Sequence, residues 1–466
     1  MMLVAGVDSS TQSCKVVVCE AESGKIVRQR RIAHPEGTEV PARAWWDAWL
    51  SAADGLLDGV AAIAVAAQQH GLVTLDARGR PVRDALLWND TRSAGAAAAL
   101  VEELGGPQEW AKAVGSVPLA AHTVAKLRWM ADREPELADR VARVLLPHDY
   151  LTWRLRGGTV DVEPTTDRGD ASGTGYWSPG EERYREDLLA LAFRGRRPGL
   201  PRVLGPAQTA GHTPDGVLVA AGTGDNAAAA LGLGLREGEV VVSLGTSGTV
   251  YTRSSSPSAD ATGAINGFAD ATGAYLPLVC TLNAARVLEA AARMLGVAAS
   301  ALEGLARQAV AGADGLTLLP YLTGERTPDL PEATGTLHGL TPRNMRPPNI
   351  ARAAAEGMVC NLAEALDRLR AGELPPRRVV LIGGAAASPL IAEIARDIFG
   401  LAVAVPEPRE YVALGAARQA AWALTATANP PDWPVPPARE IEAPAVDSGR
   451  AIRERYGRLR RAIHGN

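Results

Sequence analysis

The pair Asp225-Asn226 has the residue types best suited to catalysis in this chain. It follows the strand-like run 217–221 and the small residues Gly222-Thr223-Gly224, and it opens an alanine-rich stretch. A carboxylate at a strand end can accept the proton of a substrate hydroxyl as a general base, and Asn226 can both donate to and accept from a polyol. The pair also fits a helix N-cap. Its residue types alone favour the two interpretations about equally.

Asp8 lies inside a polar turn that follows the apolar run 3–7, in the stretch GVDSSTQSCK. Small side chains there leave backbone N–H groups and hydroxyls free to face an anion. A carboxylate would repel a phosphate unless a divalent cation lay between them, and Mg²⁺ binds through one or two carboxylates together with phosphate oxygens. Asp8 is therefore a candidate Mg²⁺ partner, with an ordinary turn aspartate as the alternative. The nearby Lys15 fits a solvated strand-end cation better than a catalytic group.

A matching turn occurs in the second half of the chain, in the stretch VSLGTSGTVY at 242–251. In both places an apolar run enters a turn of Gly, Ser and Thr and a second run leaves it, a pattern typical of a β-hairpin. Two such turns in corresponding places predict a duplicated architecture that closes on one polyphosphate.

Polar groups suited to a sugar follow two further apolar runs. They are Gln68-Gln69-His70-Gly71 after 59–67 and Trp88-Asn89-Asp90-Thr91-Arg92 after 85–87. Amide, carboxylate and imidazole groups supply the donors and acceptors that sugar hydroxyls need. A lone histidine is more often structural, and Asn89 or Asp90 would also suit a helix N-cap.

The small-residue stretch 383–388 (GGAAAS) joins a predicted strand at 378–382 to a predicted helix at 389–399. Small residues let a flat ring approach the backbone, and a helix N-terminus favours a nearby phosphate. The stretch matches neither the dinucleotide fingerprint nor the Walker loop, so by itself it indicates nucleotide binding only weakly.

The elements that must position these groups alternate between strands and helices, which predicts an α/β chain. Its 466 residues predict two or three domains, with a boundary near 236–238. Other predictions are helices at 349–371 and 449–463, loop or short strand at 156–180, and an extended proline-rich segment at 429–445.

Composition limits the classes of function. A formal net charge of −4 gives no electrostatic case for nucleic acid or an acidic membrane face. No segment approaches the roughly 18 apolar residues of a membrane span, and the N-terminal run is too short for a signal peptide. The four cysteines form no CxxC pair, which argues against a disulfide framework or a structural zinc site and fits the reducing cytoplasm.

Taken together, the motifs resemble those of the FGGY carbohydrate kinases over nearly the whole chain. The stretches that carry the resemblance are GVDSSTQSCK, AQQHG, LWNDTR, LPHDYLTWRLRG, GTGDNAAAALG, VSLGTSGTVY, LPYLTGERTP, LIGGAAASPLIAEIARDIFG and ALGAARQAA. The resemblance implies two ribonuclease-H-like (actin-like ATPase) domains flanking a deep cleft, an N-terminal sugar-binding domain at 1–237 and a C-terminal nucleotide-binding domain at 238–466. It further implies ATP-dependent phosphorylation of the terminal 5-hydroxyl of D-xylulose in the cytoplasm.

The same resemblance assigns roles residue by residue. Asp225 would be the catalytic base and Asp8 the Mg²⁺ partner. The sugar pocket would consist of Gln69, His70, Trp88, Asn89, Asp90 and Asn226. The ATP contacts would come from Thr11, Lys15, Gly245, Thr246, Gly384, Ala385 and Ser388. Two positions depart from the family pattern, because Ser10 and Ala385 stand where glycine is usual.

Alternatives remain open at this point. Within the family, the substrate could be ribulose, gluconate or another polyol, because one hydroxyl's orientation changes few contacts. A non-catalytic sugar or nucleotide sensor would need a further binding module that is not evident, and an actin-like or chaperone-like ATPase would not need the AQQHG and LWNDTR stretches. A homodimer is compatible with this interpretation, and the oligomeric state is left open.

Overall fold

The computed structural model describes residues 2–370, 376–435, 437–444 and 449–465. They form two compact units that interleave along the sequence. The first contains the residues up to Gly234 together with Ser254–Leu276 and Arg409–Val435, and the second contains Leu235–Arg253, Pro277–Pro408 and the described residues after Val435. The α/β class is confirmed. The predicted boundary at 237/238 divides the chain into two continuous halves, whereas these units interleave. The assignment of the first half to the sugar and the second to the nucleotide stays a prediction.

The first unit is built on one mixed sheet. Its strands follow the order β13-β14-β5-β1-β2-β3, and β15 also pairs with β5. Their bounds are Leu3–Ser9 (β1), Ser13–Glu20 (β2), Ile26–Ala33 (β3), Val60–Ala67 (β5), Thr209–His212 (β13), Leu218–Ala220 (β14) and Thr223–Gly224 (β15). Strands β1 and β2 form the antiparallel hairpin predicted around the first polar turn, while β1, β14 and β15 all pair with β5 in parallel.

The residue pattern of β5 explains how both faces of this sheet are covered. Ile63 and Val65 point to one hydrophobic core, which contains aromatic side chains of α1 (Ala42–Ala53) and α6 (Pro147–Leu155). Alternate residues of a strand face opposite sides, so the small Ala62, Ala64 and Ala66 face the other way. A strand covered on both faces is expected to be apolar throughout, as this strand is.

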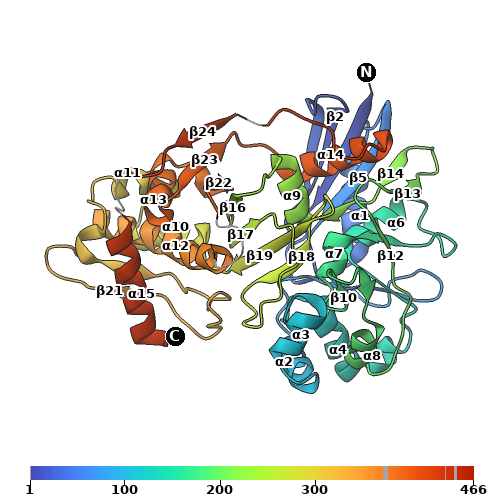
Figure 1. The fold of residues 1–466 in the computed structure, drawn as a ribbon, viewed down its shortest axis with the longest axis horizontal. Coiled ribbons are helices and arrows are strands. Elements are labelled where there is room, and N and C mark those ends of the chain that lie inside the picture. The colour runs from blue at the N-terminus through green and yellow to red at the C-terminus, as the bar shows by residue number, and fades with distance from the viewer. Residues whose placement is uncertain (1, 371–375, 436, 445–448, 466) are drawn as a thin grey trace. The chain divides into compact units, whose positions relative to one another are not determined.

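Helix α14 (Tyr411–Thr425) contacts β1, β5 and α9 (Asp225–Leu233), and it lies beside α9 and the N-terminal strands in Figure 1. Glycines permit this approach. A Cβ atom on Gly6 of β1 would lie 1.9 Å from the carbonyl oxygen of Ala413, and one on Gly415 would lie 1.8 Å from that of Ala228 in α9. Real Cβ atoms do not come so close, so the helix can pack here only because these residues have no side chain.

The remaining elements of the first unit surround the sheet and a second hydrophobic cluster that includes Trp110, Leu127 and Phe193. The helices are Ala94–Glu103 (α2), Pro107–Val114 (α3), Thr123–Arg133 (α4), Pro135–Ala138 (α5), Arg168–Ser172 (α7) and Glu186–Ala192 (α8). The short strands are Glu39–Val40 (β4), Val73–Leu75 (β6), Ala85–Leu86 (β7), Arg143–Leu145 (β8), Thr165–Asp167 (β9), Trp177–Ser178 (β10), Arg183–Tyr184 (β11), Arg202–Leu204 (β12) and Asn266–Ala269 (β18).

The second unit has a sheet of its own, with strands in the order β19-β17-β16-β22-β23-β24. Their bounds are Glu239–Leu244 (β16), Gly248–Thr252 (β17), Tyr275–Thr281 (β19), Arg378–Ile382 (β22), Ala402–Pro406 (β23) and Ala438–Ile441 (β24), and Thr317–Leu319 (β20) pairs separately with Thr336–His338 (β21). The helices are Ala285–Leu295 (α10), Leu302–Ala306 (α11), Pro347–Arg370 (α12), Pro389–Phe399 (α13) and Arg450–His464 (α15), with short 3₁₀ turns at Ala299–Ala301, Ala313–Gly315 and Gly384–Ala387.

Most predicted elements are confirmed. The second hairpin is β16-β17, and the helices predicted at 349–371, 389–399 and 449–463 appear as α12, α13 and α15, with residue 371 outside the described residues. One prediction is wrong in part, because 156–180 contains the helix α7 as well as loop and short strands. Asp167 caps that helix by accepting the backbone N–H groups of Gly169 and Asp170.

Two general predictions can be checked in the described residues. No helix there combines the length and the apolar character that a membrane span requires. All four cysteines lie within that part of the chain and none forms a disulfide.

The close contact between α14 and α9 gives a stability prediction. We expect Gly415→Ala to destabilise the protein by about 1–3 kcal/mol, because the added methyl must displace the Ala228 backbone. Gly95→Ala in α2 is the matched control, since nothing lies within 4 Å of its would-be Cβ and alanine is at least as favourable as glycine in a helix. The apparent urea midpoints of the two variants and the parent protein measure the effect. Equal midpoints for both variants would contradict the packing argument.

Candidate functional site

Three of the predicted polar stretches meet at one edge of the first-unit sheet. In the parallel pairings of β5, Asp8 of β1 lies opposite Ala66 and Gly224 of β15 lies opposite Ala67. The residues that follow β5 are Gln68, Gln69 and His70, and the residue that follows β15 is Asp225. The carboxyl ends of parallel strands are where open α/β sheets bind ligands. The sheet register therefore places Asp8, Asp225 and the Gln68–His70 stretch at a suitable edge.

Asp8 is 1% exposed and has a partner for each carboxylate oxygen. The hydroxyl of Ser10 donates to Oδ1, and Lys15 Nζ lies 3.2 Å from Oδ2. Lys15 is also 2.8 Å from Glu410, at the start of α14. Burial raises the pKa of Asp8 although Lys15 and Ser10 oppose that shift. Burial alone would lower the pKa of Lys15, but Asp8 and Glu410 raise it, so Lys15 is an ion-pair partner of both carboxylates rather than a solvated cation.

Asp225 is the first residue of α9 and is only half-buried. The backbone N–H and the side-chain amide of Asn226 both donate to its Oδ1, each at 2.8 Å. Burial and, after it, the charge of Asp8 raise the pKa of Asp225 to about 7, against the hydrogen bonds from Asn226. A carboxylate that remains accessible and is more basic than usual has the properties of a general base.

The predicted sugar-pocket residues differ in how they are held. The ring of His70 donates from Nδ1 to the carbonyl of Gly173 at 2.7 Å, so this nitrogen is used within the fold. Trp88 donates from Nε1 to the hydroxyl of Thr11 at 2.8 Å, which joins the LWNDTR stretch to the first polar turn. The side-chain oxygen of Asn89 and both polar atoms of Gln68 are buried without a hydrogen-bond partner among the described residues. Unpaired buried polar atoms are costly and suit a hydroxyl-rich ligand.

Asp90 is engaged inside the protein. It accepts hydrogen bonds from Thr38 at 2.8 Å and from the backbone and side chain of Arg92 at 3.0 and 2.8 Å. Burial alone would raise the pKa of Asp90, but the bonds from Arg92 and Thr38 lower it. Asp90 therefore fixes the conformation of the LWNDTR stretch.

A buried cluster of ionisable side chains, not predicted from the sequence, packs against the turn that precedes Asp225. It consists of His148, Asp149, Asp167 and Asp170, none more than 3% exposed. The stretch LPHDYLTWRLRG contains two of these residues, and the Asp167–Asp170 turn contains the other two. The stretch around Asp167 and Asp170 is rich in Gly, Ser and Thr and is typical of a surface loop, so the sequence gives no signal that these acids are buried.

The second unit holds the predicted ATP contacts other than Thr11 and Lys15. Strands β16 and β22 are parallel, with Ser243 opposite Ile382, so the turns that follow them lie at one edge of this sheet. A Cβ on Gly383 would lie 2.6 Å from the Leu244 backbone, which shows how close the two turns are. Gly384 and Thr246 are exposed, and Gly245 and Ala385 are partly exposed. Ser388 caps α13 by accepting from the N–H of Ile391 and donates to Glu303 at 2.7 Å.

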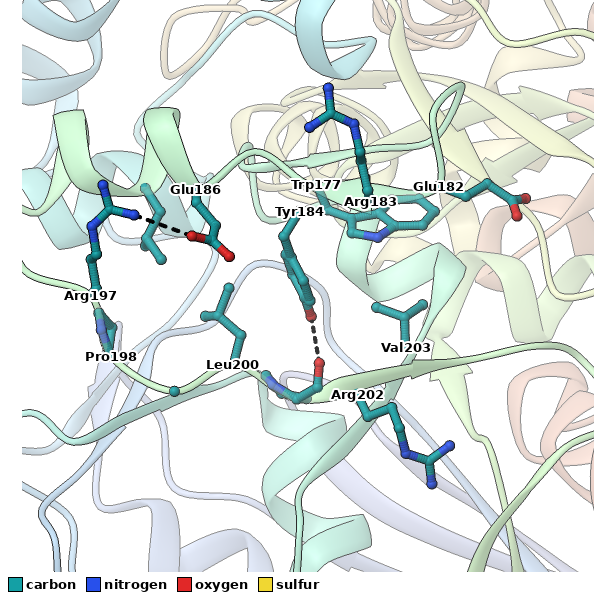
Figure 2. A pocket seen from close by; sticks show the side chains of 13 residues that line it. Trp177, Glu182, Arg183, Tyr184, Glu186, Arg197, Pro198, Leu200, Arg202 and Val203 are labelled. Atoms are coloured by element: carbon teal, nitrogen blue, oxygen red, sulfur yellow. Dashed lines mark hydrogen bonds and ion pairs between the residues drawn. The ribbon is translucent and has the colours of Figure 1, made fainter.

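A separate groove of about 720 Å³ lies in the first unit, and none of the predicted site residues lines it. Figure 2 shows that Arg197 points to Glu186, and the two side chains are 3.2 Å apart. The hydroxyl of Tyr184 donates to the carbonyl of Pro201 at 2.9 Å. Two other arginines of the groove also have acidic partners, namely Arg183 with Glu181 and Arg202 with Glu163. The positive charge is thus balanced within the protein, and we assign no ligand to this groove.

Comparison with known proteins gives two family matches. The N-terminal domain model of the FGGY family of carbohydrate kinases matches residues 3–232, and the C-terminal domain model matches residues 240–424. The two matches leave out residues 1–2, 233–239 and 425–466.

Individual proteins are similar over nearly the full length. A protein named xylulose kinase from Streptomyces coelicolor is 49% identical, with 91% of this chain and 88% of that protein covered. The solved xylulose kinase structure from Bifidobacterium adolescentis is 44% identical with a TM-score of 0.91, covering 98% of this chain and 99% of that chain. A gluconate kinase structure from Lactobacillus acidophilus has a TM-score of 0.90 at 21% identity, covering 99% and 98%, and shows the fold alone.

The proximity of two carboxylates leads to a titration prediction. We expect Asp225 to titrate near pH 7 in the metal-free protein, and Asp8→Asn to lower that pKa because it removes a neighbouring negative charge. Carboxyl ¹³C NMR of aspartate-labelled protein, with Asp225→Asn to assign the resonance, measures both values. Asp215→Asn, at an exposed site in the same unit, should leave the pKa unchanged. A value near 4 in the parent protein would contradict the prediction.

Proposed function

This chain belongs to the FGGY family of carbohydrate kinases, and from that premise we propose that it transfers the terminal phosphoryl group of ATP to the 5-hydroxyl of D-xylulose, giving D-xylulose 5-phosphate and ADP. It is thus a phosphotransferase with an alcohol acceptor. The observation that carries the proposed chemistry is the half-buried Asp225, with its raised pKa, beside the buried Asp8 at one sheet edge. The relatives named xylulose kinase support the choice of sugar.

Asp225 is assigned as the base. Both hydrogen bonds from Asn226 go to Oδ1, so we assign Oδ2 to the sugar hydroxyl. The ionised carboxylate accepts the hydroxyl proton as the new O–P bond forms, and the phosphoryl group leaves ADP. A pKa near 7 suits this role, because the group is largely ionised just above neutrality and still basic enough to take the proton.

Asp8 is assigned to Mg²⁺. The residues fit a divalent cation, because two carboxylates whose charges repel lie near each other and burial raises the pKa of both. A cation would relieve that repulsion. Since Ser10 and Lys15 already contact the two oxygens of Asp8, contact through water is as suitable as direct coordination. When bound, Mg²⁺ neutralises charge on the phosphates.

The sugar is assigned to the first unit and the nucleotide chiefly to the second. Gln69, His70, Trp88, Asn89, Asp90 and Asn226 supply the polar and aromatic surface for the sugar, with Asp90 held in place by Arg92 and Thr38. The nucleotide contacts proposed for the second unit are Gly245, Thr246, Gly384, Ala385 and Ser388. Thr11 and Lys15 keep their assignment to the phosphates. An enzyme that consumes ATP needs the cytoplasmic ATP pool, so we also propose a cytoplasmic location.

The sugar preference can be tested with a substrate panel. In a coupled assay of ADP release, we expect D-xylulose to give the highest kcat/KM, above D-ribulose, gluconate and glycerol. The margin is expected to be tenfold or more, on the order of 1.4 kcal/mol, because a wrongly placed hydroxyl leaves polar groups of the pocket unpaired. A higher kcat/KM for another compound of the panel would instead identify a sister kinase of the family.

The role of Asp225 can be tested separately from the sugar preference. Asp225→Asn keeps the shape of the side chain and removes the base, so kcat should fall about 10²–10⁴-fold with the circular dichroism spectrum and unfolding midpoint retained. Asp215→Asn is the exposed control and should keep full activity. Near-normal turnover of the asparagine variant would remove Asp225 from the mechanism while leaving family membership intact.

A further inference from the structure

His148 of α6 lies in a cluster of carboxylates that packs behind the turn carrying Asp225. Its Nδ1 is 3.1 Å from Oδ2 of Asp170 and 3.4 Å from Oδ1 of Asp149. His148 and Asp170 are fully buried, and Asp149 and Asp167 are 1% and 3% exposed. A buried charge is stable only when it is paired or hydrogen-bonded, so this cluster must be held together by protons shared among its members.

The cluster contacts the turn Ala221–Gly224 along its whole length. His148 donates from Nε2 to the carbonyl of Ala221 at 2.8 Å, and Thr223 donates to Oδ2 of Asp167, also at 2.8 Å. The two glycines fit against the cluster as well. A Cβ on Gly222 would lie 2.1 Å from Nε2 of His148, and one on Gly224 would lie 2.8 Å from Oδ1 of Asp170. Asp225 directly follows, so its position depends on these contacts.

The hydrogen-bonding groups limit the protonation state of His148. A carbonyl oxygen only accepts, so Nε2 must carry a proton. Nδ1 faces carboxylate oxygens, and the proton between Nδ1 and Asp170 belongs either to an imidazolium or to a neutral acid. The charged groups around the ring are Asp149 on its own helix and Asp167 and Asp170 at α7, and Asp225 in turn acts on Asp170. Burial alone would lower the pKa of His148, but Asp170 and then Asp149 and Asp167 raise it to about 9.

A metal ion is the other ligand that such a set suggests, because ligand atoms of His148, Asp149 and Asp170 lie within 4.8 Å of one another. Both ring nitrogens of His148, however, already face protein acceptors, Ala221 and Asp170. Whether the proton between Nδ1 and Asp170 belongs to the ring or to the acid, it occupies the position that a metal ion would need, so we do not assign one.

We propose that His148 is a positioning residue for the transfer reaction: as a buried imidazolium it holds Asp170 and the Ala221 carbonyl, and through them it fixes the turn that places Asp225. The inference rests on the proposed function, since it takes Asp225 as the base. His148 touches no reacting atom in this scheme. Its effect is on turnover, because small displacements of a catalytic group are costly in rate.

Two substitutions separate the charge of His148 from its hydrogen bonds. His148→Gln keeps a donor but removes the cation, and it should lower kcat about tenfold or more while the KM for ATP changes less than about twofold. His148→Lys keeps a cation with three donors and should restore kcat to within about threefold of the parent enzyme. His212→Gln, an exposed histidine in β13 of the same unit, is the matched control and should behave as the parent.

Imidazole ¹⁵N NMR of the parent protein gives a readout that does not depend on the variants folding. With the resonance assigned by its loss in His148→Gln, both nitrogens of His148 should be protonated at pH 7.5. A neutral ring at that pH overturns the proposal. So does a His148→Gln enzyme with the kcat of His212→Gln, or a lysine variant no better than the glutamine variant. Failure of the parent enzyme to phosphorylate any sugar of the panel would refute the proposed function instead, and the NMR result would still decide the charge of His148.

Discussion

The close packing of α14 against β1 and α9 is the constraint on which the site depends. Because Gly6 and Gly415 have no side chain, the backbone of α14 packs directly against the backbones of β1 and α9. Gly232 of α9 likewise lies against the carbonyl of Tyr411. Strand β1 ends with Asp8 and Ser9, and α9 begins with Asp225. A helix that contacts both therefore fixes the relative position of the two carboxylates. The same helix begins beside Glu410, which reaches Lys15 and so supports Asp8 from the other side.

Holding two carboxylates at one edge has an electrostatic consequence. Burial disfavours the charged form of each, and the charge of Asp8 further raises the pKa of Asp225. Lys15 compensates part of this at Asp8, whereas at Asp225 the rise in pKa is opposed by the hydrogen bonds from Asn226. This difference supports the proposed roles, in which Asp8 faces the cation and Asp225 accepts the proton. The surroundings of the two acids thus differ, although both lie at the same edge of one sheet.

The chain's own pattern was sufficient for the part of the site that lies at strand ends. Asp8, Gln69, His70 and Asp225 each follow an apolar run, and parallel strands bring the ends of such runs to one edge. The packing of α14 could not be predicted. The stretch ALGAARQAA predicts a helix of small residues, but it does not indicate which strand that helix contacts. Helix α7 has only five residues and depends on the Asp167 cap rather than on periodicity, so Asp170 was not recognised. Asp90 stays a predicted pocket residue, and its bonds to Thr38 and Arg92 could not be read from the sequence because Thr38 lies far away along the chain.

The support of Asp225 comes from two physically different sources. On the α14 side, glycine contacts exclude alternative packings by steric repulsion, which acts over short distances and does not change with pH. On the α7 side, the Ala221–Gly224 turn is held by His148, Asp167 and Asp170 through hydrogen bonds between buried ionisable groups, and these depend on protonation. A base that must stay accessible cannot be fixed by packing around its own carboxylate. It has to be positioned through the backbone on either side of it, and in our proposal the polar cluster does this with both ring nitrogens of His148 protonated.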